Sequence, residues 1–485
     1  MEDSAPMIPY KFSQCFGDKS ENIEVADGKG KRSKHIIRFL TFLLIADLIS
    51  TVQFDSTGDF LASGDRAGRV VLFQRNYSKK TCEYKFYSEF QSHEPEFDYL
   101  KSLEINERIN KLSWLPRTHS AHFILSTNDK TIKLWKIKER QVQSVLENNL
   151  TLSQRNNSLS SPSLTLPKVI SREKVVAATP KRIFSSAHAY NIHSISPSSD
   201  GEIFISSDDL RINLWNLNSS EIAFNVVDCK PPTIEDLTEV ITSATFHPSH
   251  GNLFMYSTSR GNLRLCDLRD SALCDQSSLT FGIGNSSSSS NSNGFFDEII
   301  SSVTDVKFSP SDPNTFLSRD YLNTHLWDMR MDSSPLLSLP IHDHIRPRLC
   351  DLYENDSVFD KFECSFNYNG TSIISGSYNN YLKVTETEGN SSNGISASAF
   401  DLIHADKSIF RNPSALKRTK SSMSTSASAS ASKSSGSLKK SSSWEDFTNL
   451  SSLDFSKKIL HFSMHPSENS VAIASSSNLF IFSQL

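Results

Sequence analysis

The chain has 485 residues, a hydrophobic fraction of 37% and a formal net charge of −4 at pH 7. This weakly negative charge argues against a general nucleic-acid-binding surface. No apolar run reaches the roughly 18 residues that a membrane-spanning helix needs, so we expect no membrane span. Seven scattered cysteines without a CxxC pair, and the lack of a secretory h-region at the N-terminus, indicate reduced, intracellular thiols. The expected location is the cytoplasm, with the nucleus as a second compartment.

A β-hairpin signature recurs seven times along the chain. Each copy is a short apolar run that carries a serine, followed by a turn rich in Gly, Asp, Asn or Ser and by a second strand that ends in a large residue. The copies occupy residues 61–73, 124–135, 204–215, 255–266, 316–327, 373–384 and 473–482. Seven copies of one hairpin predict seven copies of one structural unit.

Another short strand precedes each hairpin, and these strands begin at Ile49, Ile109, Ile192, Ile241, Val303, Phe362 and Ile459. With a fourth strand in each unit, the pattern predicts an all-β fold: a seven-bladed WD-repeat β-propeller that residues 1–485 form as a single domain. The strand-like run 10–17 and the C-terminal strand are expected to pair and close the ring. The repeated serines are interpreted as structural, because repetition around a ring does not create a single active site.

Every unit is longer than the roughly 40–45 residues of a WD repeat, so each blade is expected to carry an insertion. Residues 86–107 are charged and aromatic and predict an inserted hairpin arm. Residues 143–179, 282–294 and 386–443 are rich in serine and other polar residues and predict flexible, disordered loops. Residues 28–46 form a basic and apolar insertion in the linker before the first blade.

The sequence contains no recognisable catalytic constellation. GDRAGR (64–69) lies in a hairpin turn and lacks the partner motifs of a metallophosphatase, and GKGK (28–31) lacks the spacing of a phosphate-binding loop. His342 and His344 have no Cys or carboxylate cluster at metal-ligand spacing. We therefore predict a protein without enzymatic activity, metal or cofactor, in which the propeller serves as a binding platform.

The inserted segments allow a more specific assignment. The runs FQSHEPEFDYLKSLEINERINKLSWLP, LSTNDKTIKLWKI, DDLRINLWNL, EDLTEVITSATFHP, RLCDLRDSALCD, FFDEIISSVTDVKFS and LCDLYENDSVFDKFEC resemble the B-type, 55-kilodalton WD-repeat regulatory subunit of protein phosphatase 2A. The resemblance extends from about residue 12 to residue 482, with gaps at the serine-rich tracts. It implies a non-enzymatic protein that joins a HEAT-repeat scaffold (A) subunit and a metal-dependent catalytic (C) subunit, and that recruits phosphoprotein substrates with basic segments.

The resemblance also implies two binding surfaces. The scaffold-binding arm would consist of His93, Glu94, Glu96, Phe97, Asp98, Tyr99, Leu100 and Lys101. Its aromatic residues can anchor an interface, and its carboxylates can form a polar rim. An acidic groove at the propeller mouth would bind substrates through Tyr190, Asp209, Leu210, Glu235, Leu237, Tyr353, Asp356 and Lys361. Carboxylates beside apolar residues suit a basic helix or basic segments that flank a phosphosite.

Some positions depart from the family pattern. Asn191 follows Tyr190 where the family usually has histidine, and Met464 stands where it usually has tryptophan. These changes concern substrate preference more than the fold. The ends of the insertion 28–46 can be encoded with splice-donor and splice-acceptor sequences, and its removal leaves the family-like EVADDLISTVQF. It is interpreted either as a lineage-specific loop or as a retained intron.

An alternative hypothesis is a WD-repeat adaptor of another complex, such as a ubiquitin ligase. The predicted arm at 93–107 distinguishes the two, because a generic adaptor has no need of it. An enzyme is the third hypothesis, and it is disfavoured because no acid, base and nucleophile converge in the sequence.

Overall fold

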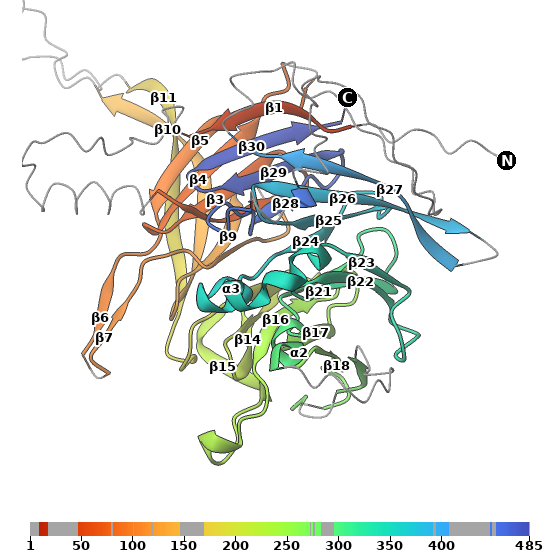
Figure 1. Ribbon diagram of the computed structural model, residues 1–485. Helices are drawn as coiled ribbons and strands as arrows, with labels where there is room; N and C mark the ends of the chain where they lie inside the picture. Colours follow the sequence, from red (N-terminus) through yellow and green to blue (C-terminus); the bar gives the residue numbers. More distant parts are fainter. Residues whose placement is uncertain are drawn as a thin grey trace, which may run out of the picture.

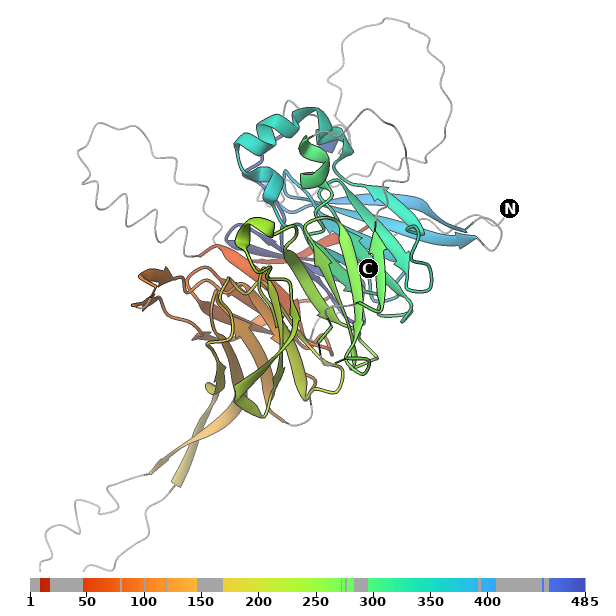
Figure 2. The same cartoon turned by 90° about the horizontal axis from the view of Figure 1, so that it is seen from below.

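The computed structural model describes residues 9–17, 47–78, 81–99, 101–117, 120–145, 169–271, 273–274, 277–282, 295–390, 394–406, 447–448 and 453–484. Within these residues the chain forms seven four-stranded antiparallel sheets around a ring, with a few short helices (Figure 1, Figure 2). The predicted all-β, seven-bladed propeller is confirmed. In this part of the chain no helix is long and apolar enough to cross a membrane.

Six blades follow one another along the chain. The first blade consists of β2 (Ile49–Phe54), β3 (Phe60–Asp65), β4 (Arg69–Arg75) and β5 (Tyr84–Gln91). The second blade consists of β8 (Lys111–Trp114), β9 (His122–Thr127), β10 (Ile132–Val145) and β11 (Val169–Phe184). The third blade consists of β12 (Ser194–Pro197), β13 (Ile203–Ser207), β14 (Arg211–Asn216) and β15 (Ser219–Asp228). The fourth blade consists of β16 (Ile241–Phe246), β17 (Leu253–Thr258), β18 (Asn262–Asp267) and β19 (Leu279–Gly282). The fifth blade consists of β20 (Asp305–Phe308), β21 (Thr315–Arg319), β22 (Asn323–Asp328) and β23 (Leu337–Pro340). The sixth blade consists of β24 (Cys364–Phe366), β25 (Ser372–Gly376), β26 (Tyr381–Asn390) and β27 (Gly394–His404).

The seventh blade closes the ring by joining strands from both ends of the sequence. It contains β28 (Phe462–Met464), β29 (Ser470–Ser475), β30 (Asn478–Ser483) and, as its fourth strand, β1 (Lys11–Phe16). The first strands of neighbouring blades contact one another in order around the ring, including β28 with β2. The expected pairing of the terminal strands is therefore present, and closure leaves only short sheet edges.

Large apolar side chains fill the space between neighbouring blades. Phe204 lies opposite Trp215 in the β13–β14 pair, and Phe316 lies opposite Trp327 in the β21–β22 pair. In each pair the rings are stacked with centroids 6.2 Å apart, and all four side chains are buried. The large residue at the end of a hairpin therefore completes the apolar layer between two blades.

The insertions contain more regular structure than the sequence indicates. The arm predicted at 86–107 is shorter, because β5 takes its first residues; it is the hairpin of β6 (Glu96–Asp98) and β7 (Leu103–Ile105), which stands away from the blades (Figure 1). Both ends of the predicted loop 143–179 are strand, because β10 and β11 pair along their whole length. The start of the predicted loop 386–443 belongs to the paired strands β26 and β27. Pairing with an ordered neighbour supplies the backbone hydrogen bonds, so polar sequences can also form strands.

Other predicted insertions cannot be compared with the structure. Residues 28–46 lie outside the described residues, as do residues 283–294 and 407–446.

The linkers between blades share one face of the ring, which we call the linker face. Each first strand begins beside the turn between the second and third strands of the preceding blade. The Ile192 N–H donates to the Asp129 carbonyl at 3.0 Å, and the Ile241 N–H donates to the Asp209 carbonyl at 2.8 Å. The linker face therefore carries the β6–β7 arm and the short helices η1 (Ile234–Asp236), α2 (Phe295–Ile300), η2 (Asp343–Arg348), α3 (Leu349–Glu354) and η3 (Ser357–Phe359).

Candidate functional site

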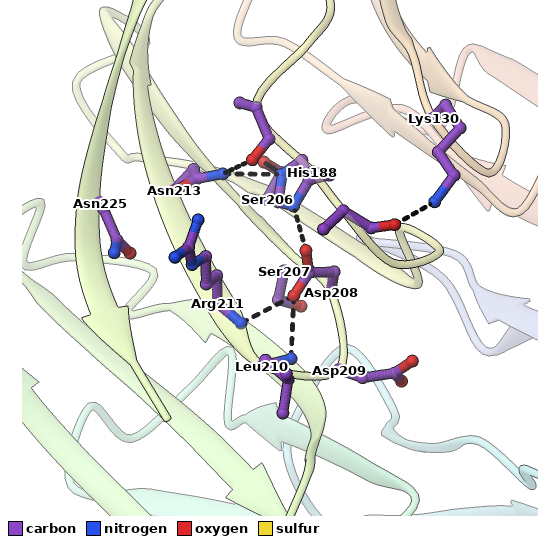
Figure 3. Close-up of polar contacts among 12 residues, drawn as sticks. Lys130, His188, Ser206, Ser207, Asp208, Asp209, Leu210, Arg211, Asn213 and Asn225 are labelled. Atoms are coloured by element: carbon purple, nitrogen blue, oxygen red, sulfur yellow. Dashed lines mark hydrogen bonds and ion pairs between the residues drawn. The ribbon is translucent and has the colours of Figure 1, made fainter. Parts of the chain in front are cut away.

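A buried polar network fixes the third blade. His188 Nδ1 lies 3.0 Å from Asp208 Oδ2, and His188 Nε2 lies 2.6 Å from Ser206 Oγ (Figure 3). Trp215 Nε1 donates to Ser206 Oγ at 2.8 Å. All four side chains are buried. Burial alone would raise the pKa of Asp208, but the hydrogen bond with His188 and those from two backbone amides lower it below its usual value. Ser206 is thus part of a structural network, in agreement with the interpretation of the repeated serines.

Asp208 also fixes the turn between β13 and β14. Its Oδ1 accepts the N–H of Leu210 at 2.9 Å and the N–H of Arg211 at 2.7 Å. Asp209 points away from this network, and its side chain is 44% exposed (Figure 3). Turn aspartates commonly cap backbone amides. Here Asp208 does so, which leaves the Asp209 carboxylate available to a partner.

Leu210 is buried, whereas its predicted role in substrate binding requires an exposed side chain. Its side chain is only 3% exposed, and its carbonyl accepts the N–H of Cys229 at 2.8 Å. The prediction for Leu210 is therefore corrected. The residue supports the turn from inside, and the contact surface around Asp209 must come from other linkers.

Asp209 and Lys361 line the same pocket on the linker face, which has a volume of about 450 Å³. Apolar side chains complete its wall, among them Val240, Ile299 and Phe359. Burial raises the pKa of Asp209, and the nearby charge of Lys361 opposes this rise. Burial likewise lowers the pKa of Lys361, and Asp209 opposes that fall. The pocket therefore presents a partly desolvated carboxylate beside apolar surface, which suits a segment with basic and apolar side chains.

Three of these wall residues were missed in the sequence. Phe359 is 57% exposed, although it is a large aromatic residue. A lone aromatic residue in a polar linker has no periodic pattern, so the sequence cannot distinguish an exposed ring from a buried one. Val240 and Ile299 come from two different linkers, and only the folded ring brings them together.

Tyr353 and Asp356 lie next to this pocket, on the linker that contains α3 and η3. Tyr353 is 39% exposed, and its ring centroid lies 6.1 Å from that of Phe359. Asp356 is exposed and has a φ of 55° immediately before η3. Tyr353, Asp356 and the Asp209–Lys361 pocket therefore form one continuous part of the linker face.

A second hollow, of about 190 Å³, lies beside η1 and is lined by Leu237 together with Asp236 and Glu239. Leu237 is 37% exposed, and Glu235 is exposed on η1. The chain runs directly from this hollow to the Val240 wall of the first pocket. The structure therefore places Glu235 and Leu237 beside the predicted groove.

Tyr190 belongs to a different part of the linker face. It is 39% exposed on the linker between β11 and β12, and it lines neither hollow. Lys130 donates to the neighbouring Ala189 carbonyl at 2.6 Å, as Figure 3 shows. Tyr190 is therefore available on the face that carries Asp209, but the described structure does not bring the two side chains together.

The β6–β7 arm exposes most of its predicted interface residues. Tyr99 is 85% exposed and Phe97 is 45% exposed, with their ring centroids 5.0 Å apart. Glu94, Glu96 and Lys101 are exposed and Asp98 is half-buried, whereas Leu100 lies outside the described residues.

The arm and Asp209 also share an electrostatic environment. Burial lowers the pKa of Lys130, the charge of Lys101 lowers it further, and Asp209 acts in the opposite direction. The arm is therefore close enough to influence the face that carries the groove.

His93 does not belong to the exposed arm, which corrects its predicted role in binding a scaffold. Its side chain is 1% exposed, and its Nδ1 lies 3.1 Å from Ser92 Oγ. Burial, followed by the charge of Lys133, lowers the pKa of His93 to about 3. This histidine anchors the base of the arm in its neutral form.

The buried His93 predicts a pH dependence of stability. Its folded-state pKa of about 3 lies below the usual value of about 6.5, so between these pH values the unfolded chain binds more protons than the folded chain. The free energy of unfolding should therefore fall as the pH falls from 7 to 5. We expect His93→Gln to lose less stability over this range than the wild type, as measured by urea unfolding at each pH. An equal loss in both proteins would contradict the role given to His93.

Cys82, His465 and Glu468 lie close enough to one another to hold a metal ion. However, Arg75 Nη2 donates to both carboxylate oxygens of Glu468, at 2.6 and 2.8 Å, and Arg75 Nη1 lies 3.2 Å from His465 Nε2. The Arg75 guanidinium therefore already neutralises this carboxylate and contacts the imidazole. We therefore interpret the cluster as a contact between the first and seventh blades.

Comparison with known proteins assigns the chain to a family. Residues 178–216 match the WD domain, G-beta repeat, and this segment contains the His188–Asp208 network. The PP2A regulatory B subunit of Schizosaccharomyces pombe is 49% identical over 490 residues, which cover 100% of this chain and 99% of that protein. The chain belongs to the family of PP2A regulatory B subunits.

Further family members support the same assignment. The PP2A regulatory B subunit of Candida tropicalis is 45% identical over 533 residues, with 98% of this chain and 99% of that protein covered. The beta isoform of the 55 kDa regulatory B subunit of Carassius auratus is 45% identical over 461 residues, with 93% and 97% covered. The resemblance predicted from the sequence is confirmed. The family consists of regulatory subunits, which agrees with the predicted lack of enzymatic activity.

Proposed function

We propose that this protein recruits phosphoprotein substrates to a protein phosphatase 2A heterotrimer and so sets its specificity. The near-full-length similarity to PP2A regulatory B subunits carries the proposal. The linker face supports it, because the exposed Asp209 carboxylate there lies at a pocket whose wall is partly apolar. The proposed partners are proteins and not nucleic acids. The proposed location is the cytoplasm and the nucleus.

The proposed substrates carry basic segments near their phosphosites. A lysine or arginine of the substrate would pair with Asp209, and a neighbouring apolar side chain would enter the pocket beside Phe359. Complementary charge favours the correct partner and speeds its association. The proposed substrate-binding residues are Tyr190, Asp209, Glu235, Leu237, Tyr353, Asp356 and Lys361.

The β6–β7 arm is proposed to bind the HEAT-repeat scaffold subunit. Phe97 and Tyr99 supply exposed aromatic surface, which is the kind of side chain that dominates interface energies. Glu94, Glu96, Asp98 and Lys101 would form the polar rim. Because the arm and the groove share the linker face, a scaffold bound there would hold the catalytic subunit close to a recruited substrate. The arm also favours this function over that of a generic WD-repeat adaptor.

Reconstitution tests the proposed function. We expect the purified chain to form an equimolar complex with a PP2A scaffold subunit and catalytic subunit, observed by size-exclusion chromatography with light scattering. A WD-repeat propeller from an unrelated complex is the control and should remain separate. Failure of this chain to join the two subunits would contradict the proposal.

A further inference from the structure

Residues 343–360, which we call the crown, carry two of the proposed substrate-binding residues and directly precede a third. Buried apolar side chains attach the crown to the propeller: Leu352 and Val358 belong to the same cluster as Tyr321 and Tyr378 of the blades below. Apolar packing of this kind holds the crown in place. It does not fix the direction of an exposed side chain, because dispersion contacts are non-directional.

The Tyr378 hydroxyl supplies directional contacts beneath the crown. It lies 2.9 Å from the Ser357 carbonyl and 3.1 Å from Asp360 Oδ2, and both acceptors belong to the crown. Lys458 Nζ donates to the other carboxylate oxygen of Asp360 at 2.5 Å. Tyr378 is 1% exposed, so water cannot readily replace its hydroxyl.

The number of O–H groups in this cluster determines which group donates each hydrogen bond and which group accepts it. A phenol has one O–H to donate, and the Ser357 carbonyl and the ionised Asp360 carboxylate can only accept. The single Tyr378 proton is therefore shared between the two crown acceptors. The Tyr321 hydroxyl, 2.9 Å away, then donates to the Tyr378 oxygen. The Ser357 carbonyl also accepts the Asp360 N–H at 3.2 Å, so loss of the Tyr378 hydroxyl would leave it with that donor alone and would remove a donor from Asp360 Oδ2. Lost hydrogen bonds to buried acceptors are costly in a protein interior.

Asp356 immediately precedes this anchored carbonyl and has a left-handed backbone, with φ at 55°. A non-glycine residue keeps such a conformation only when its surroundings hold it there. We propose that Tyr378 is a positioning residue for substrate recognition: by holding Ser357 and Asp360, it orients Asp356 and Lys361 on either side of η3. This inference rests on the proposed function and adds to it a residue that never contacts the substrate.

Hydrogen exchange in the free subunit tests the structural half of the inference without using any activity. Tyr378→Phe keeps the buried ring and removes only the hydroxyl. We expect the amides of residues 356–360 to exchange about tenfold faster in this variant, because local opening becomes easier. Tyr84→Phe is the matched control, since it removes an equally buried hydroxyl that donates to the Gly58 carbonyl of the first blade rather than to the crown. Exchange that is unchanged in Tyr378→Phe, or equally fast in both variants, would overturn the inference.

Kinetics of the reconstituted heterotrimer test the functional half. For a phosphoprotein substrate with a basic segment, we expect Tyr378→Phe to raise KM about fivefold with little change in kcat. Turnover of a short phosphopeptide without that segment should not change, and Tyr84→Phe should behave like the wild type.

Asp356→Lys separates this inference from the proposed function, because it leaves Tyr378 in place. A raised KM for Asp356→Lys with an unchanged KM for Tyr378→Phe would overturn the inference alone. An unchanged KM for both variants would overturn substrate recognition by the crown as well.

Discussion

Asp209→Lys is expected to lower kcat/KM of the heterotrimer about tenfold, or about 1.4 kcal/mol, for a phosphoprotein with a basic segment. The carboxylate is exposed at the mouth of an apolar pocket, where a reversed charge would repel the same segment. The turn itself should persist, because Asp208 and not Asp209 caps its amides. Exposed substitutions of this kind usually change stability by less than about 0.5 kcal/mol.

Two controls separate recruitment from folding and from net charge. Glu221→Lys makes the same change in net charge on an exposed position of β15, and it should leave the rate unchanged. Raising the salt concentration should reduce the difference in kcat/KM between Asp209→Lys and the wild type, because salt screens the interaction between exposed charges. If Asp209→Lys slows dephosphorylation of a short phosphopeptide as much as that of the phosphoprotein, Asp209 supports the fold or the assembly. Its assignment to the groove must then be abandoned.

Replacing residues 94–101 by a short Gly-Ser turn is expected to weaken binding of the scaffold subunit at least about tenfold, or about 1.4 kcal/mol. The replacement removes the exposed rings of Phe97 and Tyr99, which are the strongest candidate anchors of the arm. The propeller should retain its stability, because β6 and β7 pair with each other and not with a blade. Biolayer interferometry against the immobilised scaffold subunit would measure the affinity.

Ile234→Ala is the matched control for the arm. Ile234 is 65% exposed on η1, so its removal also trims apolar surface from the linker face but leaves the arm intact. Scaffold binding should not change in this variant. Unchanged scaffold affinity after removal of the arm, combined with poorer use of basic substrates, would instead assign the arm to the substrate-binding surface with which it shares the linker face.

The repeated part of the fold could be predicted from the sequence because its signal is local. The alternating residues around Ser206 and Trp215 predict a hairpin, and the same pattern repeated seven times predicts a closed ring. Most of β11 and all of β27 fall within segments that were predicted as flexible loops. Their sequences show no clear strand pattern, and they form strands because each pairs with a neighbouring strand. Their order is a consequence of the fold more than of intrinsic propensity.

The candidate site could be predicted only in part, because it is assembled from separate linkers. Asp209 stood out through the family resemblance, and the structure confirms its exposure. Leu210 and His93 are adjacent to exposed residues in the sequence but are buried in the fold, because the turn beside Asp209 and the base of the arm direct these two side chains inward. Phe359 was missed for the converse reason, since nothing in its local sequence indicates an exposed aromatic ring.

The most direct test measures substrate preference with and without this protein. The ratio of kcat/KM for a phosphoprotein with a basic segment to kcat/KM for a short phosphopeptide would be determined for the scaffold–catalytic dimer and for the heterotrimer. We predict that adding this chain raises the ratio at least about tenfold, and that Asp209→Lys removes most of the increase. A ratio that stays the same when the chain joins the complex would contradict a role in substrate recruitment.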